Sequence, residues 1–233
     1  MADDTHALLQ RIEQHLQKLA RGQELLYEQV EALLNLHAML SPLNAPLPAM
    51  RKWAISPDFG ILLYSLLSEY HPMHVVELGG GVSTIITGYY CTHAGVGTVR
   101  AFDHHPLYAQ LARKQLDAHQ LIDVARVTHA PLMSIVLSDQ AWEWYDPNAF
   151  SGLYAIDFLT IDGPPQQDNP LEMARYPALP LLYDRLSSGA IILVDDYHRE
   201  HEQRCVARWL DEFDLVHLQT VDNEKGAVVL QKP

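Results

Sequence analysis

The sequence predicts an α/β fold with a seven-stranded, mostly parallel sheet that ends in an antiparallel hairpin strand, preceded by a long N-terminal helix. Strand-like and helix-like segments alternate from residue 74 onward, which is typical of a parallel sheet with helices on both faces. A turn too short for a helix joins the last two strand-like segments, and residues 5–40 follow a heptad pattern.

The N-terminal segment has the apolar spacing of a coiled coil. Its heptad core positions hold, in order, Leu9, Ile12, Leu16, Leu19, Gln23, Leu26, Val30, Leu33, His37 and Leu40. We expect one long helix, or two in tandem broken at Gly22, because a glycine inside a helix costs about 1 kcal/mol. Two interpretations stay open: a coiled coil that makes a homo-oligomer, or an amphipathic helix folded onto its own domain.

Prolines divide the chain. Ser41-Pro42 ends the helical segment, so we expect residues 1–41 as a helical unit, 42–52 as a proline-rich linker and 53–233 as the main domain. The main domain opens with a helix that has Ser56 as N-cap and Pro57 at its first position, and that reaches about Tyr70.

The expected parallel strands are His74–Leu78, Thr98–Phe102, Ala125–Thr128, Phe158–Ile161 and Ala190–Val194, with helices at 83–92, 106–119, 171–186 and 198–211. Two further strands, Leu215–Thr220 and Ala227–Gln231, flank a turn at 222–226. Because this turn holds no crossover helix, the last strand must run antiparallel to its neighbour.

Composition narrows the class of protein. The chain has 233 residues, of which 48% are apolar and 19% charged, as in a globular protein. A net charge of −13 makes nucleic acid a poor partner and favours a small acceptor. Two cysteines without metal-like spacing, and an acidic N-terminus unlike a signal peptide, indicate a cytoplasmic protein. No apolar run reaches the roughly 18 residues of a membrane span.

A glycine-rich turn follows the first strand. Gly79-Gly80-Gly81 allow a ligand to approach the backbone, and the next helix offers free N–H groups. Glu77 suits a ligand with an ammonium group and would repel a pyrophosphate. Ser83-Thr84 replace the third glycine of the dinucleotide fingerprint. The alternative is a turn used only for packing.

Carboxylates end three strands. Asp103 follows the second strand and can hold a ribose diol. Asp162 follows the fourth, and Asp195 and Asp196 follow the fifth, all at the edge where ligands bind in parallel sheets. Such a cluster binds a hard cation or supplies a base and orienting groups. The alternative for Asp195 or Asp196 is a helix N-cap.

These motifs resemble the class I S-adenosylmethionine (SAM)-dependent methyltransferases with a Rossmann-like fold, and more closely methyltransferase family 24. The similarity covers residues 53–231 and excludes the N-terminal helix. It is carried by Glu77-Leu78-Gly79-Gly80-Gly81-Val82-Ser83-Thr84, Asp103, Ile161-Asp162-Gly163-Pro164-Pro165, Arg175-Tyr176-Pro177-Ala178-Leu179-Pro180 and Gly189-Ala190-Ile191-Ile192-Leu193-Val194-Asp195-Asp196.

The resemblance implies how SAM would bind. The glycine loop would pass under its methionine moiety, with Glu77 and Ser83 at that end. Asp103 would bind the ribose hydroxyls, and His104 and His129 would border the adenine. Asp162 would face the sulfonium and the acceptor, as a catalytic residue.

A partial likeness to the magnesium-dependent catechol and sugar O-methyltransferases implies Mg²⁺ on Asp162, Asp195 and Asp196. The sugar enzymes carry their base where this chain has Pro164, so the base must come from elsewhere. His198 is the candidate, because histidine exchanges protons near neutral pH; the alternative is a surface histidine. Residues 142–146, Trp-Glu-Trp-Tyr-Asp, are expected as a loop that lines the acceptor pocket or covers the sheet.

The expected activity is therefore methyl transfer from SAM to an oxygen or nitrogen of a small-molecule or sugar acceptor. One alternative is an aminopropyltransferase using decarboxylated SAM, which the retained Glu77 disfavours. Another is a coiled-coil assembly protein whose domain binds SAM without catalysis, which the intact loop and Asp103 disfavour.

Overall fold

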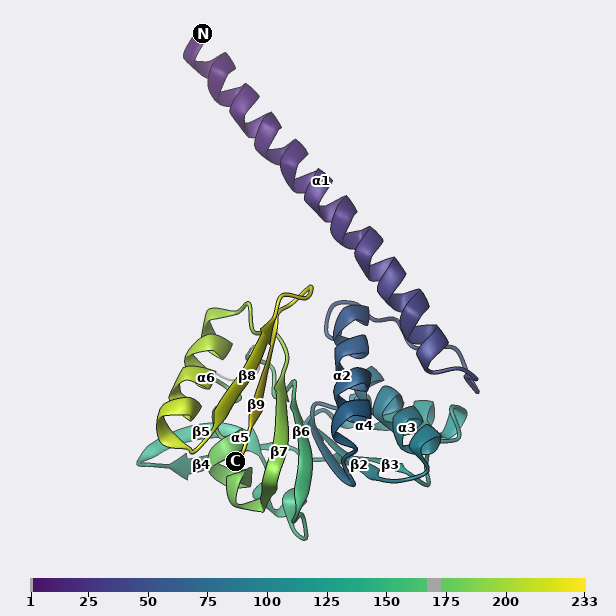
Figure 1. Ribbon diagram of the computed structural model, residues 1–233. Helices are drawn as coiled ribbons and strands as arrows, with labels where there is room; N and C mark the ends of the chain where they lie inside the picture. Colours follow the sequence, from purple (N-terminus) through teal and green to yellow (C-terminus); the bar gives the residue numbers. More distant parts are fainter. Residues whose placement is uncertain (1, 167–172) are drawn as a thin grey trace.

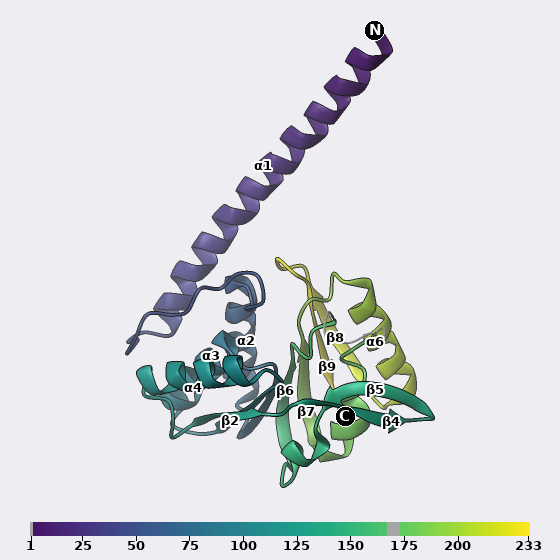
Figure 2. The same ribbon diagram turned by 180° about the vertical axis from the view of Figure 1, so that it is seen from behind.

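The computed structural model describes residues 2–166 and 173–233, and the core of the molecule is one seven-stranded sheet (Figures 1 and 2). The strand order is β3-β2-β1-β6-β7-β9-β8. The strands are β1 (His74–Leu78), β2 (Thr98–Asp103), β3 (Ala125–His129), β6 (Ile156–Ile161), β7 (Leu186–Val194), β8 (Val216–Val221) and β9 (Ala227–Gln231). The pairs among the first five are parallel, and β9 is antiparallel to both β7 and β8. The predicted fold class is confirmed.

Both faces of the sheet are covered, so alternate side chains of each central strand enter different cores. On one face, Val75 and Val99 pack with α2 (Pro57–Tyr70), α3 (Val82–Ala94) and α4 (Pro106–Ala118). On the other, Val76 and Phe102 pack with α5 (Ala178–Leu182), α6 (Glu200–Glu212) and a separate hairpin. This layering leaves the carboxyl ends of the strands as the shared edge of the predicted site.

The separate hairpin was not predicted. It consists of β4 (Leu132–Leu137) and β5 (Gln140–Tyr145). The prediction of a loop at 142–146 is therefore wrong for residues 142–145, which belong to β5. Ser138 and Asp139 form its two-residue turn with φ of 49° and 62°. Such a turn usually contains glycine, and the Ser-Asp pair therefore escapes a search for hairpin signals. Its tryptophans are buried against the sheet, which supports a covering role.

The helix expected at 171–186 is also wrong, apart from residues 171–172, which lie outside the described residues. Only Ala178–Leu182 are α-helical, a 3₁₀ turn spans Tyr183–Arg185, and β7 already begins at Leu186. Pro177 and Pro180 lack the N–H groups that a longer helix would need. Tertiary contacts draw Arg175 into the interior, as described below.

The N-terminal helix α1 (Ala2–Met39) is continuous through Gly22 and extends away from the domain (Figures 1 and 2). Only its last turns contact the domain, through the buried Ala32 and Leu36, and Leu40 directly after the helix is buried as well. The proposed division at residues 41 and 52 stays a prediction. Among the described residues, no helix has the length and apolar character to cross a membrane.

Candidate active site

The glycine loop is held between the ends of β2 and β6. The Gly79 N–H donates to the Phe102 carbonyl oxygen at 2.8 Å, and the Asp162 N–H donates to the Leu78 carbonyl oxygen at 2.8 Å. Gly79 has a φ of 97°, and a Cβ there would lie 2.8 Å from the Asp162 carbonyl oxygen. By contrast, the space beside Gly81 is open to at least 4 Å, at the N-terminus of α3. The loop thus joins Asp162 to a helix N-terminus with room for a ligand.

Glu77 lies beneath this loop and is fully buried. Its carboxylate accepts hydrogen bonds from the hydroxyls of Thr87 at 2.6 Å, Thr84 at 2.8 Å and Ser83 at 3.1 Å, all on α3. Burial raises the pKa of Glu77, and these hydroxyl bonds oppose that shift. The carboxylate therefore ties β1 to the first turns of α3. Direct contact of Glu77 or Ser83 with a cofactor stays a prediction.

Three predicted residues meet at the ends of β2 and β3. Asp103 is buried and accepts a hydrogen bond from the His105 N–H at 2.7 Å. Burial raises the pKa of Asp103, and the hydrogen bond from the His105 N–H is the largest effect that opposes this shift. His129 Nε2 lies 3.1 Å from the His104 carbonyl oxygen, which joins the ends of the two strands. The structure therefore brings Asp103, His104 and His129 together at the ends of β2 and β3, and their contact with SAM stays a prediction.

The three predicted metal ligands converge. Asp162, Asp195 and Asp196 each offer a carboxylate oxygen, and these atoms all lie within 4.8 Å of one another. Asp195 and Asp196 are buried, whereas the Asp162 side chain is 15% exposed. Asp162 is thus the member of the cluster that a bound molecule can reach.

Arg175 stands in the middle of these carboxylates, with a side chain only 2% exposed. Its Nη2 lies 2.6 Å from Asp196 Oδ2 and 3.1 Å from Asp162 Oδ1. Its Nη1 donates to the Asp195 carbonyl oxygen at 2.9 Å, and its Nε lies 3.4 Å from Glu202 Oε1. No role for Arg175 was predicted. The sequence feature that could have indicated a buried role is that Arg175 is the single cation in the otherwise apolar segment 173–182, which contains two prolines.

Part of the cluster keeps free coordinating capacity. Both carboxylate oxygens of Asp195 and Oδ1 of Asp196 are buried and accept no hydrogen bond from the described residues. Lys225 Nζ approaches Asp195 Oδ2 only to 4.0 Å. Burial, and then the neighbouring Asp196, raises the pKa of Asp195 to about 6, while burial and Asp195 raise that of Asp162 well above its usual range. Buried carboxylate oxygens of this kind fit a hard cation such as Mg²⁺.

His198 lies in the segment between β7 and α6 and contacts the turn of the β8–β9 hairpin. Its Nε2 is 3.0 Å from Asp222 Oδ1, its ring packs on Gly226, and its side chain is half-exposed. Among the described residues, no hydrogen bond or ion pair joins it to Asp162, Asp195 or Asp196. Its role as general base stays a prediction.

Residues 76–197, more than half of the chain, match the methyltransferase-domain family known as methyltransferase family 24. The chain belongs to this family. The membership confirms the class I SAM-dependent methyltransferase that the motifs predict, and with it an enzyme. No curated protein matches the chain.

Solved structures share the fold of this methyltransferase. An O-methyltransferase from Bacillus cereus, in complex with SAH, is 16% identical with a TM-score of 0.59, over 87% of this chain and 91% of its own. A Podospora anserina methyltransferase bound to SAH is 12% identical with a TM-score of 0.61, over 78% and 80%. TomG, an O-methyltransferase of tomaymycin synthesis from Streptomyces achromogenes, in complex with SAM, is 14% identical with a TM-score of 0.57, over 88% of each chain.

Tyr145 is a further residue at the site of the methyltransferase that was expected only as part of a loop. It ends β5 and is buried, and its ring centroid lies 6.5 Å from that of His104. Its hydroxyl occupies the space that a side chain at position 163 would need, so Gly163 after Asp162 is required for this contact. Burial raises the pKa of Tyr145 well above 10, which keeps the hydroxyl protonated.

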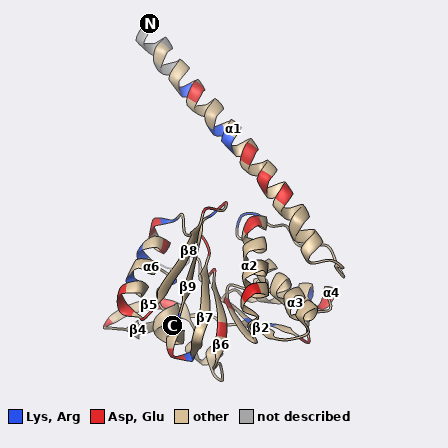
Figure 3. Cartoon of the chain, in the orientation of Figure 1, with Lys and Arg blue, Asp and Glu red and all other residues tan. Residues whose placement is uncertain are grey.

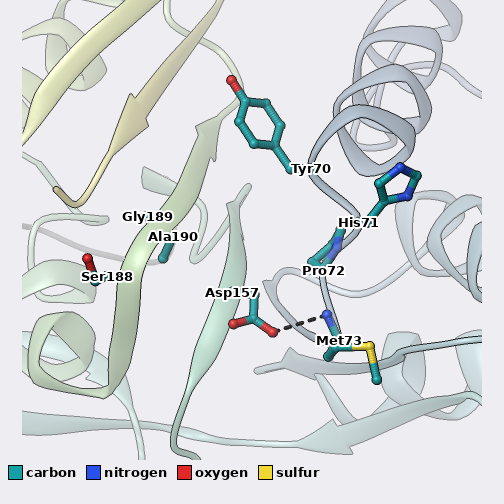
Figure 4. Close-up of a pocket in the computed structure, with 8 residues that line it drawn as sticks. All are labelled: Tyr70, His71, Pro72, Met73, Asp157, Ser188, Gly189 and Ala190. Atoms are coloured by element: carbon teal, nitrogen blue, oxygen red, sulfur yellow. Dashed lines mark hydrogen bonds between the residues drawn. The ribbon is translucent and has the colours of Figure 1, made fainter.

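A surface cavity of about 270 Å³ lies at the opposite, amino-terminal edge of the sheet of the methyltransferase (Figure 4). Asp157 lines it and accepts hydrogen bonds from the N–H groups of Met73 and His74, both at 3.0 Å. These contacts stabilise the start of β1. None of the predicted site residues lines this cavity.

We expect Gly79→Ala to weaken SAM binding more than Gly95→Ala. Both glycines have positive φ, 97° and 68°, so both substitutions share the left-handed strain of about 1–2 kcal/mol. Only at Gly79 does the added Cβ meet the Asp162 carbonyl oxygen; the space at Gly95 is open. Isothermal calorimetry should show a Kd about 10-fold or more weaker for the Gly79 variant. Equal losses would mean that the close approach to Asp162 is unimportant.

Proposed function

We propose that this methyltransferase transfers the methyl group of SAM to an oxygen or a nitrogen of a small-molecule or sugar acceptor, with a metal ion at Asp162, Asp195 and Asp196. One observation carries the proposal: Asp162 belongs to both halves of the site. Its backbone contacts Leu78 and Gly79 of the cofactor loop, and its carboxylate joins the acidic cluster. A group held at the loop and a group held at the cluster therefore meet at one residue. The O-methyltransferases of the same fold, solved with SAM or SAH, support this assignment.

On the cofactor side, SAM supplies a methyl group on a good leaving group, and the chain's residues bind and align it. Asp103 is the proposed acceptor for the ribose hydroxyls, with His104 and His129 beside the adenine. Glu77 is the proposed partner of the cofactor's amino group, and the hydroxyls of α3 hold its carboxylate in place. The open space beside Gly81 is the proposed place of the methionine end.

On the acceptor side, a bound Mg²⁺ would supply a positive charge that favours the ionised form of an acceptor hydroxyl. The chain's own contribution is to hold the three carboxylates together, which Arg175 does from the buried side. His198, hydrogen-bonded to Asp222, is the proposed general base, in the arrangement of a base oriented by a carboxylate. The overall acidity of the chain favours a small acceptor over a nucleic acid.

Calorimetric titration of the purified chain with SAM, SAH and decarboxylated SAM tests the cofactor assignment. We expect SAM and SAH to bind and decarboxylated SAM to bind more weakly, because it lacks the carboxylate that the helix N-terminus of α3 favours. Absence of SAM binding by the folded chain would overturn the proposal. Preference for decarboxylated SAM would favour an aminopropyltransferase instead.

Methyl transfer to a panel of sugars and catechols, with and without EDTA, tests the metal. Activity should be lost with EDTA and return with Mg²⁺. In Asp195→Asn, added Mg²⁺ should no longer restore the activity. Asp211→Asn, on the far end of α6, is the control that should keep it. Activity that is unaffected by EDTA would remove the metal from the proposal and leave SAM binding intact.

A further inference from the structure

We propose that α1 pairs with the α1 helix of a second copy of this chain as a parallel, two-stranded coiled coil. The inference concerns assembly and is independent of the methyl acceptor. It rests on the free length of α1, on its heptad seam, on one polar seam residue and on the charges of its two edges.

Most of α1 has no covering element in the described chain. The helix is about 57 Å long at 1.5 Å per residue. Figures 1 and 2 show that its last turns lie against the domain and that the rest of the helix extends away from it. Gln29 Nε2 donates to Asp58 Oδ2 at 2.7 Å, and Ala32 and Leu36 are buried against the domain. These docking residues lie on the g and c positions of the heptad. Leu40, the last d position, is also buried against the domain, just past the end of α1. The domain therefore fixes the direction of α1 without using the a and d positions from residue 9 to residue 33.

The a and d positions form an exposed apolar seam. Its apolar members are between 39% and 70% exposed: Leu9, Ile12, Leu16, Leu19, Leu26, Val30 and Leu33. A 3.5-residue spacing kept over this length stays on one line only when two helices supercoil around each other. A second copy presents the same seam, so the occupant that matches it in length and spacing is an identical helix.

Gln23 decides the direction of the pair. It occupies an a position, and all d positions of the exposed seam are Ile or Leu. In a parallel pair, a positions face a positions, so the two Gln23 amides can hydrogen-bond each other. In an antiparallel pair, a positions face d positions, so every register would press Gln23 against Ile12, Leu19, Leu26 or Leu33. Polar pairing therefore favours the parallel arrangement in register.

The charges beside the seam favour the same direction. Basic and acidic residues both occur along α1 (Figure 3). Between residues 9 and 34, the c and g positions carry Arg11, His15 and Lys18 and no acid, whereas the b and e positions carry Glu13, Glu24 and Glu31 and no base. In a parallel pair the g edge of one helix runs beside the e edge of the other. Of the named residues only His15 is at g and only Glu13 is at e, and the others flank these positions. A parallel pair therefore places the flank with Arg11 and Lys18 on the same side as the partner's flank with Glu24 and Glu31, whereas antiparallel pairing would bring flanks of like sign together.

Sedimentation equilibrium of the full chain tests the pairing. We expect a mass near twice 26.3 kDa. Leu26→Glu, at a d position, should weaken association about 100-fold or more, because both copies lose a buried leucine. Leu25→Glu changes the neighbouring leucine at a c position and should leave the dimer intact. A monomeric wild-type chain, a threefold mass, or equal effects of the two variants would overturn the proposal. Unchanged SAM binding and circular dichroism would show that each variant is folded.

Oxidative cross-linking of Ile12→Cys tests the direction. In a parallel pair, two d positions at residue 12 face each other, so a covalent dimer should form. In an antiparallel pair that matches the seams, residue 12 faces Val30, about 27 Å from residue 12 of the partner. The native Cys91 and Cys205 are buried and should give no dimer in the wild-type control. A dimer by mass that fails to cross-link through Ile12→Cys would overturn the parallel arrangement.

Discussion

Arg175→Met should lower the free energy of unfolding by about 3–5 kcal/mol, the cost of removing one partner from a buried ion-pair network. Methionine fills much of the same volume, so the loss would come from charge rather than from a cavity. Asp162, Asp196 and Glu202 would remain together without the guanidinium that now lies within 3.4 Å of each. Urea denaturation at pH 8 measures the difference.

The loss in free energy of unfolding caused by Arg175→Met should also depend on pH. Arg175 now lowers the pKa of Asp162, Asp195 and Glu202, so its removal raises all three further. Between the ordinary carboxyl pKa and these raised values the folded state holds more protons than the unfolded state, so stability falls as pH rises. The stability difference between the wild type and Arg175→Met should therefore be smaller at pH 5 than at pH 8.

Arg126→Met, at an exposed position on β3, is the matched control and should change stability by less than about 0.5 kcal/mol. A second comparison is the double variant with Arg175→Met and Glu202→Leu, which removes one uncompensated carboxylate and should recover part of the loss. If Arg175→Met is as stable as Arg126→Met at both pH values, the ion-pair network does not hold this edge of the sheet together.

Asp162→Asn should lower kcat for methyl transfer by about 10²–10⁴-fold, the range for a group that orients or deprotonates a reacting atom. Its backbone N–H and carbonyl, which contact Leu78 and Gly79, are retained in the variant. SAM affinity should therefore change by only a few-fold, while the carboxylate that reaches the open side of the cluster is lost. Steady-state kinetics with saturating SAM and calorimetry on the same preparation separate the two effects.

Asp157→Asn provides the control on the same strand. Asp157 lies near the amino end of β6 and bonds to the backbone at the start of β1, whereas Asp162 follows the carboxyl end. It should lower stability moderately and leave kcat close to the wild-type value. An unchanged kcat for Asp162→Asn, with the Asp157 variant also unchanged, would place the reacting centre elsewhere in the molecule.

Local signals account for what could be predicted of the cofactor half of the site. The bounds of β1 and β9 match the expected residues, because apolar runs ended by glycine or turn residues mark buried strands. The glycine loop and Asp103 follow strand ends, and parallel strands bring such ends to one edge. The same reasoning placed Asp162, Asp195 and Asp196 together, which the structure bears out with oxygens within 4.8 Å.

The missed features depend on contacts between distant residues. Arg175 is held in the core by carboxylates from three other segments, and it lies in a turn before α5 rather than in the helix expected at 171–186. The Ser138-Asp139 turn has positive φ at both residues without glycine, so the β4–β5 hairpin and the position of Tyr145 gave little local signal.

The amino-acid sequence by itself determined the chain order of the seven strands of the main sheet, the cofactor loop and its acidic partners, since these follow from local periodicity and turn chemistry. Only the tertiary structure decided how the charges are balanced. Whether a buried carboxylate is paired, open to a cation or bonded to hydroxyls depends on which segments pack against it. Arg175 among the aspartates and Glu77 beneath the hydroxyls of α3 are the two clearest cases.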